Sequence, residues 1–293
     1  MTRWLWLLPL AAAIAVGWLC TRPDGFHTGV EVGVAGRTVA SIPASGTDSV
    51  GDQPSGAPAV LELTVLGKYP HDSQAFTQGL LWHEGKLYET TGHYGRSRLR
   101  RVDLDTGAVE QEVSLAADYF GEGLTLVPET GSARAELLWL TWRAGRAFRF
   151  DLETFELVGE HTYQGQGWGL CWRDGELYRS DGTSTLWRHG SADLEVRERL
   201  QVTRNGLPVD LVNELECTPE GILANVWQSD EILRIDPTSG RVTATADASD
   251  LIPLEERGKD AVLNGIAYRS ETGTFFLTGK NWPWLFEVAL EER

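Results

Sequence analysis

Five short stretches of the chain carry a polar or aromatic side chain at a matched position, beside a glycine or a glutamate. They read "AFTQGL", "YFGEGL", "GWGLCW", "NELECT" and "NGIAYR". The matched residues recur 44 to 51 residues apart and are Gln78, Glu122, Trp168, Asn213 and Asn264. A second matched set ends the apolar run that follows each opening, and its members are Glu89, Trp142, Asp181, Trp227 and Lys280.

These residue types could build a pocket for acid–base chemistry. A repeat kept only for packing would tend to reuse one residue type, whereas here the matched positions differ in chemistry. Among aromatic side chains the pKa of Glu122 would rise toward neutrality, as proton transfer near pH 7 prefers. Lys280, Asn213 and Gln78 could donate hydrogen bonds to developing negative charge. Tryptophan side chains, of which the chain has 12, could wall the pocket.

Each of these residues also has an ordinary structural explanation. Glu122 could be a solvated carboxylate, and the tryptophans could be core residues. For Gln78, a brace between neighbouring backbones is as well supported as a substrate contact. Turn capping is the favoured explanation for Asn264, and turn or inter-strand contacts are favoured for Glu89 and Asp181.

The elements that must position these side chains are short strands. Each repeat has a strand-like run of 4–8 residues, a turn containing glycine, a second apolar run and a third strand, as in "LRRVDLDTG". A period of roughly 40–50 residues made of hairpins is typical of a β-propeller, with one four-stranded sheet in each repeat. The sequence therefore predicts an all-β, five-bladed β-propeller in which equivalent positions converge on one axis. The stretch Leu61–His71 and the terminal "WLFEVAL" are expected to complete one blade together.

The N-terminal part of the chain has a different composition. Seventeen uncharged residues run from Trp4 to Cys20, which predicts a signal peptide or membrane anchor over residues 1–20. Residues 21–60 are rich in Gly, Ser, Pro and Ala and predict a flexible linker. The propeller domain should cover residues 61–293. We expect an exported protein, periplasmic or secreted, with cleavage after Ala15, lipidation of Cys20 and a retained membrane tether as open alternatives.

Charge and cysteine content narrow the classes of partner. The net charge of −16 argues against a nucleic-acid partner, which would need a basic face. Neither the histidines nor the cysteines show the spacing of metal ligands, so we expect no metal and no cofactor. In an oxidising compartment Cys171 and Cys217 could pair, but two separate buried thiols are slightly favoured.

The motifs together resemble one known family, the plant-type glutaminyl-peptide cyclotransferases, which include bacterial members. The resemblance covers roughly Tyr69 to Leu290 and consists of "YPHDSQAFTQGL", "YETTGHYGRSRLRRVDLDTG", "YFGEGLTL", "LTW", "GWGL", "SDG", "NELE", "ANVW", "LNGIAY" and "TGKNWP", all in family order. It implies a five-bladed propeller without zinc, consistent with the repeat. It also implies a pocket formed by Phe76, Gln78, Phe120, Glu122, Trp142, Trp168, Asn213, Trp227 and Lys280.

The resemblance further implies a reaction. An N-terminal glutaminyl residue of a peptide or protein would be converted to pyroglutamyl with loss of ammonia, as its α-amine attacks its own γ-carboxamide. Glu122 would move the protons, with Lys280 and Asn213 as the other catalytic residues. Gln78, the two phenylalanines and the three tryptophans would bind the substrate. We expect the enzyme to act as a monomer.

Two functions of other classes stay open at this point. A metal-dependent propeller hydrolase of the lactonase kind would need several acidic ligands on the axis, where the matched set has one clear acid. A non-catalytic propeller would bind peptides without turnover.

Overall fold

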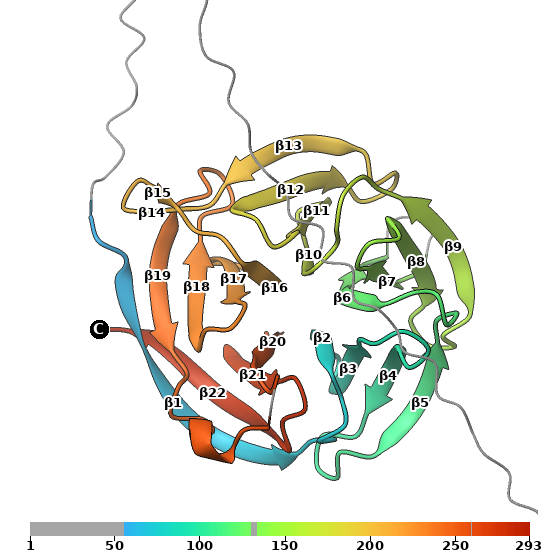
Figure 1. Ribbon diagram of the computed structural model, residues 1–293, viewed down its shortest axis with the longest axis horizontal. Coiled ribbons are helices and arrows are strands. Elements are labelled where there is room, and N and C mark those ends of the chain that lie inside the picture. The colour runs from blue at the N-terminus through green and yellow to red at the C-terminus, as the bar shows by residue number, and fades with distance from the viewer. Residues whose placement is uncertain (1–55, 130–133, 259) are drawn as a thin grey trace, which may run out of the picture. The chain divides into compact units, whose positions relative to one another are not determined.

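The computed structural model describes residues 56–129, 134–258 and 260–293 (Figure 1). The expected signal or anchor segment, residues 1–20, lies outside the described residues, as does nearly all of the expected linker. Within the described ranges, no helix is long and apolar enough to cross a membrane.

Three four-stranded antiparallel sheets are each built from four consecutive strands. The first contains β2 (Thr77–His83), β3 (Lys86–Thr91), β4 (Arg98–Val102) and β5 (Val109–Ser114). The second contains β6 (Gly121–Val127), β7 (Glu136–Thr141), β8 (Arg146–Asp151) and β9 (Leu157–Thr162). The third contains β10 (Leu170–Arg173), β11 (Glu176–Arg179), β12 (Thr185–Gly190) and β13 (Val196–Gln201).

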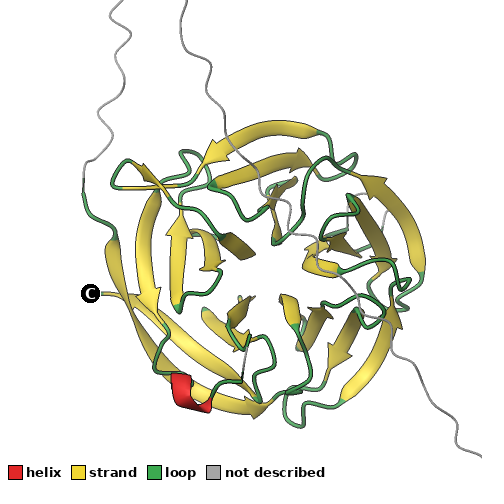
Figure 2. Ribbon diagram, viewed as in Figure 1, coloured by secondary structure: helices red, strands yellow, loops and turns green. Residues whose placement is uncertain are grey.

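The rest of the ring is one eight-stranded sheet. Its strands, in spatial order, are β16 (Val212–Thr218), β17 (Gly221–Val226), β18 (Glu231–Ile235), β19 (Val242–Asp247), β1 (Ala59–Pro70), β22 (Trp284–Glu292), β21 (Thr274–Gly279) and β20 (Leu263–Arg269). A short hairpin, β14 (Thr203–Arg204) with β15 (Leu207–Pro208), and one 3-10 turn, η1 (Leu254–Glu256), complete the described elements (Figure 2). The prediction of an all-β fold is confirmed, and the arrangement resembles a β-propeller.

The two ends of the described chain hold the ring closed. Strand β1 pairs antiparallel with β22, from Leu61 opposite Glu292 to Pro70 opposite Trp284. It also pairs in parallel with β19 over residues 59–61. The expected pairing of the two terminal stretches is therefore confirmed.

The strands nearest the centre are β2, β6, β10, β16 and β20 (Figure 1). Each contacts the next around a closed circle, and β20 contacts β2. These inner strands begin at the openings of the sequence repeat, and their first residues are buried. A strand buried on both sides needs backbone partners and apolar neighbours all round.

Glycines next to the matched residues allow these inner strands to approach closely. A Cβ atom at Gly79 would lie 2.5 Å from the backbone nitrogen of Leu124, and one at Gly123 would lie 2.6 Å from the carbonyl oxygen of Trp168. At Gly169 a Cβ atom would collide with the carbonyl oxygen of Asn213. The Gly that recurs in the motifs is thus required because backbone packs against backbone at these points.

Glu214 replaces this glycine in the fourth opening. Its buried carboxyl accepts a hydrogen bond from the Ile266 backbone nitrogen at 2.9 Å and a weaker one from that of Leu80 at 3.4 Å. Burial raises the pKa of Glu214 well above its usual value, so the side chain can stay neutral among these strands. It ties β16 to both β20 and β2.

Apolar layers fill the space between neighbouring sheets. Leu81 of the first sheet packs in one cluster with Trp139 of the second. Where the ring closes, Leu87 of the first sheet packs in one cluster with Phe276 of β21. Because every sheet buries both faces in this way, the inner strands are held by their neighbours as well as by their own ladders.

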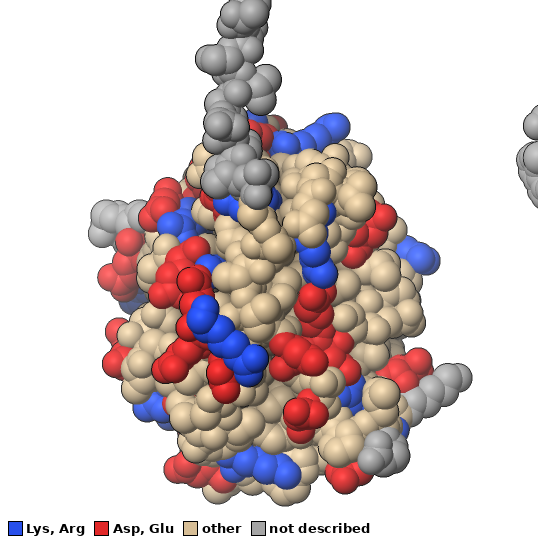
Figure 3. Space-filling view, turned by 90° about the vertical axis from the view of Figure 1, so that its left-hand side faces the viewer, with Lys and Arg blue, Asp and Glu red and all other residues tan. Residues whose placement is uncertain are grey.

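On the outer wall, acidic and basic side chains are mixed. On the face shown in Figure 3, Lys and Arg side chains lie among Asp and Glu. Arg293 pairs with Glu62 at 3.1 Å near the chain end, and both side chains are more than half exposed. Exposed pairs of this kind stabilise a fold only slightly, so the closure depends on the strand pairing and the apolar layers.

Cys171 of β10 and Cys217 of β16 form a disulfide. The expectation of two separate thiols is wrong. The two residues lie on adjacent inner strands, with Cα atoms 5.4 Å apart, which is within the range that a disulfide spans. The sequence could not show this, because the residues are 46 positions apart and in different sheets.

We expect Gly123→Ala to lower the free energy of unfolding by about 2–3 kcal/mol, because the new methyl group would press on the backbone of the next sheet. Gly159→Ala in the outer strand β9 is the matched control, since its Cβ would meet Arg149 at an ordinary 3.6 Å. Urea unfolding of both variants measures the difference. Equal stabilities would contradict the close contact between inner strands.

We expect the double variant Cys171→Ala/Cys217→Ala to lose about 4 kcal/mol of unfolding free energy, the amount typical for a closed loop of this length. Denaturant unfolding with and without a reducing agent provides the test. The reductant should destabilise the wild type and leave the double variant unchanged. A wild type that is indifferent to the reductant would argue against the disulfide.

Candidate active site

One cavity of about 260 Å³ collects all the residues that the sequence singled out for a site. It is lined by Phe76, Gln78, His93, Phe120, Glu122, Trp142, Trp168, Asn213, Trp227 and Lys280, and we call it the pocket. The nine predicted site residues therefore do lie together. His93 is the tenth, and the sequence reasoning missed it.

The polar groups of the pocket form its buried part. The side chains of Gln78, Glu122, Asn213 and Lys280 come from residues that are at most 5% exposed. Three of them stand at the start of inner strands β2, β6 and β16, and Lys280 follows the end of β21. Among the described residues, these four side chains receive a single hydrogen bond, a long one of 3.5 Å from Asn264 to Gln78. Buried polar groups usually have hydrogen-bond partners, so these four side chains are suited to form hydrogen bonds with a ligand.

Aromatic rings form the wall of the pocket. Phe76 and Phe120 meet edge to face with centroids 6.3 Å apart, and Phe120 lies 5.6 Å from Trp142. Trp168 and Trp227 meet edge to face at 5.7 Å. All five are only partly buried, so they leave an opening to solvent while they surround the polar groups. Such contacts are rigid and exclude water around the buried polar groups.

Gln166 joins the two halves of this wall. Its Oε1 atom accepts hydrogen bonds from the indole nitrogens of Trp142 at 2.6 Å and of Trp168 at 3.1 Å. Its own backbone oxygen accepts a hydrogen bond from Arg179. The sequence reasoning missed Gln166, because nothing in "YQGQGWGL" distinguishes it from an ordinary loop residue.

Burial changes the proton affinity of both ionisable groups. Desolvation raises the pKa of Glu122 well above its usual value, and the charge of Lys280 partly opposes that rise. Desolvation lowers the pKa of Lys280 to about 8, and Glu122 partly opposes that fall. The expected rise for Glu122 is confirmed. Burial thus favours the protonated form of Glu122 and the neutral form of Lys280, each relative to the same group in water.

In the loop after β3, the residue that lines the pocket is His93 and not the matched residue Glu89. Trp142, Trp227 and Lys280 directly follow the strands β7, β17 and β21. Strand β3, however, continues to Thr91, so the equivalent loop begins three residues after Glu89. The pattern "ETTGHYG" could have indicated His93 only if the end of this strand had been known.

Glu89 belongs to a buried network away from the pocket lining. It pairs with Arg100 at 2.5 Å and with His71 at 3.0 Å, and accepts a hydrogen bond from Thr77 at 2.6 Å. These partners hold the pKa of Glu89 far below its usual value. The network is a structural tie, as favoured from the sequence.

Asp181 and Asn264 are also structural. Asp181 accepts a hydrogen bond from the Thr183 backbone nitrogen at 3.1 Å within its turn and another from the Trp187 indole at 2.8 Å. Asn264 does not cap a turn, so that expectation is wrong. It lies inside β20, where its amide donates to the backbone oxygen of Thr77 at 2.9 Å and ties β20 to β2.

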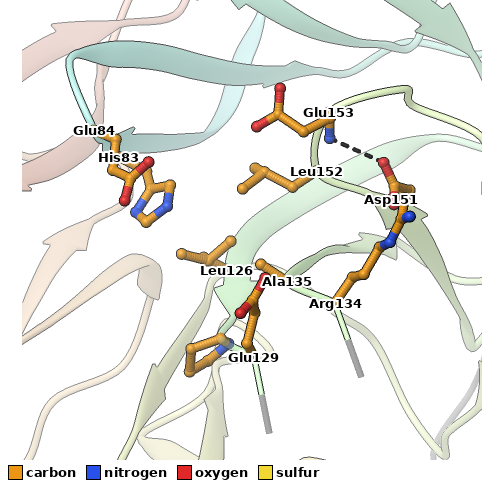
Figure 4. A pocket seen from close by; sticks show the side chains of 10 residues that line it. His83, Glu84, Leu126, Glu129, Arg134, Ala135, Asp151, Leu152 and Glu153 are labelled. Carbon is orange, nitrogen blue, oxygen red and sulfur yellow. Dashed lines mark hydrogen bonds and ion pairs between the residues drawn. The ribbon is translucent and has the colours of Figure 1, made fainter. Parts of the chain in front are cut away.

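A larger cavity, of about 500 Å³, lies elsewhere between the first and second sheets (Figure 4). Its charged side chains include Glu84, Glu129 and Glu153, all exposed to solvent. Asp151 beside them accepts hydrogen bonds from its own turn, as from the Glu153 backbone nitrogen at 3.1 Å. Solvated or satisfied groups of this kind do not indicate a binding site, unlike the buried groups of the pocket.

The described domain is similar to proteins that are already known. A family model described as glutamine cyclotransferase matches residues 38–290. The chain is 40% identical over 237 residues to glutaminyl-peptide cyclotransferase of Arabidopsis thaliana, covering 79% of this chain and 72% of that protein. The crystal structure of Myxococcus xanthus glutaminyl cyclase aligns with a TM-score of 0.75 at 38% identity, covering 80% of this chain and 99% of the other.

The lowered pKa of Lys280 predicts a pH dependence of stability. Between pH 8 and 10.5 the unfolded chain holds this proton more tightly than the folded one, so Lys280 makes stability rise with pH in that interval, by about 3 kcal/mol. Lys280→Met should lack this contribution. Urea unfolding of both proteins at pH 8 and pH 10 tests it, and parallel pH profiles would contradict the burial of a titrating lysine.

Proposed function

This chain belongs to the glutamine cyclotransferase family, and we propose that its pocket converts the N-terminal glutaminyl residue of a peptide or protein to pyroglutamyl. The chain catalyses glutaminyl-peptide cyclotransfer, an acyl transfer within the substrate that releases ammonia. One observation supports the pocket as the site of this reaction. Four buried polar side chains lie inside an aromatic wall and have almost no hydrogen-bond partners in the protein.

The first step is the folding of the substrate. The α-amine must reach its own γ-carboxamide carbon, so the glutaminyl side chain has to bend back on itself. Rigid indole and phenyl rings around a small cavity favour such a compact conformer and exclude water. Orientation alone can contribute up to roughly 10 kcal/mol to the lowering of a barrier. No nucleophile of the protein is required.

Glu122 moves the proton. Attack forms the new C–N bond and leaves the former amine with a proton to lose, while the departing nitrogen needs a proton to leave as ammonia. A carboxyl whose pKa is raised by burial can take the first proton and deliver one to the leaving group. The attack itself closes the five-membered ring, and the old C–N bond breaks as the second proton reaches the departing nitrogen, which leaves as ammonia.

Lys280, Asn213 and Gln78 stabilise the oxygen of the tetrahedral intermediate. As the amine attacks, negative charge develops on the former carbonyl oxygen. A buried ammonium and two buried amides can donate hydrogen bonds to it without reorganising. The pKa of about 8 keeps Lys280 mostly charged at neutral pH, which suits this role.

The sheet arrangement fits a propeller of five blades. The eight-stranded sheet is joined only by the short parallel pairing of β1 with β19, over residues 59–61. Dividing it there gives two four-stranded blades, β16–β19 and β20–β22 with β1, beside the three four-stranded sheets. The ring of inner strands supports the same division.

Export is the localisation that these features favour. The Cys171–Cys217 disulfide supports it, because such bonds persist mainly in oxidising compartments. The uncharged segment from Trp4 to Cys20 would direct it, and would tether the domain to the membrane if it is retained. A monomer remains the expected form of the enzyme.

We expect Glu122→Gln to lower kcat for ammonia release from a Gln-initiated peptide by about 10²-fold or more, since it removes the proton carrier but keeps the shape. A coupled ammonia assay measures this, and urea unfolding checks that the variant is folded. Glu153→Gln, at the exposed outer cavity, is the control and should keep full activity. Full activity of Glu122→Gln would disprove the assignment. Peptide binding by the wild type without turnover would instead indicate a binding module.

A further inference from the structure

His93 is the pocket residue without a role in the mechanism above. Its ring packs against Phe76 with centroids 4.3 Å apart and lies 5.6 Å from Phe120. Unlike the four buried polar residues, His93 is only partly buried. Its ring nitrogens form no hydrogen bond with the described residues. The imidazole is therefore a polar group in the aromatic wall, nearer to solvent than the reacting groups.

The backbone holds His93 in an unusual conformation. Its φ angle of 87° lies in the left-handed region, which is unfavourable for a residue with a side chain. Its carbonyl oxygen accepts hydrogen bonds from Ser97 Oγ at 2.8 Å and from the Arg96 backbone nitrogen at 3.0 Å. Ser97 Oγ in turn accepts one from the Gly121 backbone nitrogen at 2.8 Å, next to Glu122. Strain of this kind is retained where the surrounding structure enforces it, often at functional sites.

The charged groups around His93 favour its neutral form. Burial, Arg96 and Lys280 lower its pKa, and Asp260 opposes them. A neutral imidazole has one N–H donor and one acceptor nitrogen. It can therefore complement a peptide group, which has a carbonyl acceptor and an N–H donor, without adding charge beside Lys280.

If the pocket performs the proposed reaction, the buried groups bind the α-amine and the γ-carboxamide. The peptide group that links the N-terminal glutamine to the second residue must then pass the half-exposed wall toward solvent. We propose that His93 hydrogen-bonds this peptide group and so makes the enzyme select glutaminyl peptides over smaller ligands that carry only the amine and the amide. His93 is thereby a specificity-determining residue, and it takes no part in the proton transfer.

Two variants separate hydrogen bonding from packing. His93→Phe keeps an aromatic ring against Phe76 and removes both ring nitrogens. His93→Gln removes the ring and keeps a donor and an acceptor at a similar reach. Turnover is measured with the amide of the dipeptide Gln-Ala. The comparison ligand is 4-aminobutanamide, which has the amine and the amide but no peptide group, and its inhibition constant is measured against the dipeptide.

We expect His93→Phe to lower kcat/KM for the dipeptide about fivefold, mainly through KM, which is the effect of one neutral hydrogen bond. Its inhibition constant for 4-aminobutanamide should equal that of the wild type. His93→Gln should keep the preference for the dipeptide. The opposite pattern, with the preference kept by His93→Phe and lost by His93→Gln, would show a packing role and overturn the proposal.

Unchanged preference in both variants would overturn it as well. Thermal unfolding of each variant checks the fold, and if His93→Phe does not fold, His93→Gln alone decides between the two roles. Failure of the wild type to release ammonia from the dipeptide would overturn the proposed function itself, together with the role of His93. That outcome is distinguishable because it precedes any comparison of variants.

Discussion

The close contact between neighbouring inner strands is the constraint on which the rest of the structure depends. At Gly79, Gly123 and Gly169 there is no space for a Cβ atom, because the backbone of the next sheet occupies it. The residue before each of these glycines is a pocket residue: Gln78, Glu122 or Trp168. The distance between inner strands therefore sets the separation of the pocket side chains. The disulfide between Cys171 and Cys217 reinforces one of these contacts, because it joins β10 to β16, the strand that carries Asn213.

Burial has opposite consequences for two carboxylates of this fold. Glu89 and Glu122 are both almost fully buried. Arg100 and His71 lie within ion-pair distance of Glu89 and keep it charged, whereas Glu122 has only the more distant influence of Lys280 and gains proton affinity. Both carboxylates are buried to a similar extent, so it is the charged neighbours that decide which one is structural and which can carry a proton. The same comparison explains why the exposed acids of the larger cavity offer no comparable chemistry.

The wall of the pocket is organised by residues that do not react. Gln166 fixes the orientation of Trp142 and Trp168, and the turn around His93 is fixed through Ser97. The Gln166 contacts join the loop after β7 to the loop before β10, and the Ser97 contacts join the loop after β3 to the start of β6.

The sequence alone determined the all-β fold, the pairing of the terminal strands and the nine pocket residues, partly through the repeat and partly through the family resemblance. These features could be predicted because strand periodicity and turn residues are local properties. The repeat, in addition, places equivalent residues at the same level along the central axis of the ring. The tertiary structure alone decided the rest: the disulfide, the role of Asn264 as a tie between strands, and the presence in the pocket of His93 instead of Glu89. Each of these depends on where a strand ends or on which backbone lies opposite, and such distances are set only when the sheets pack around the ring.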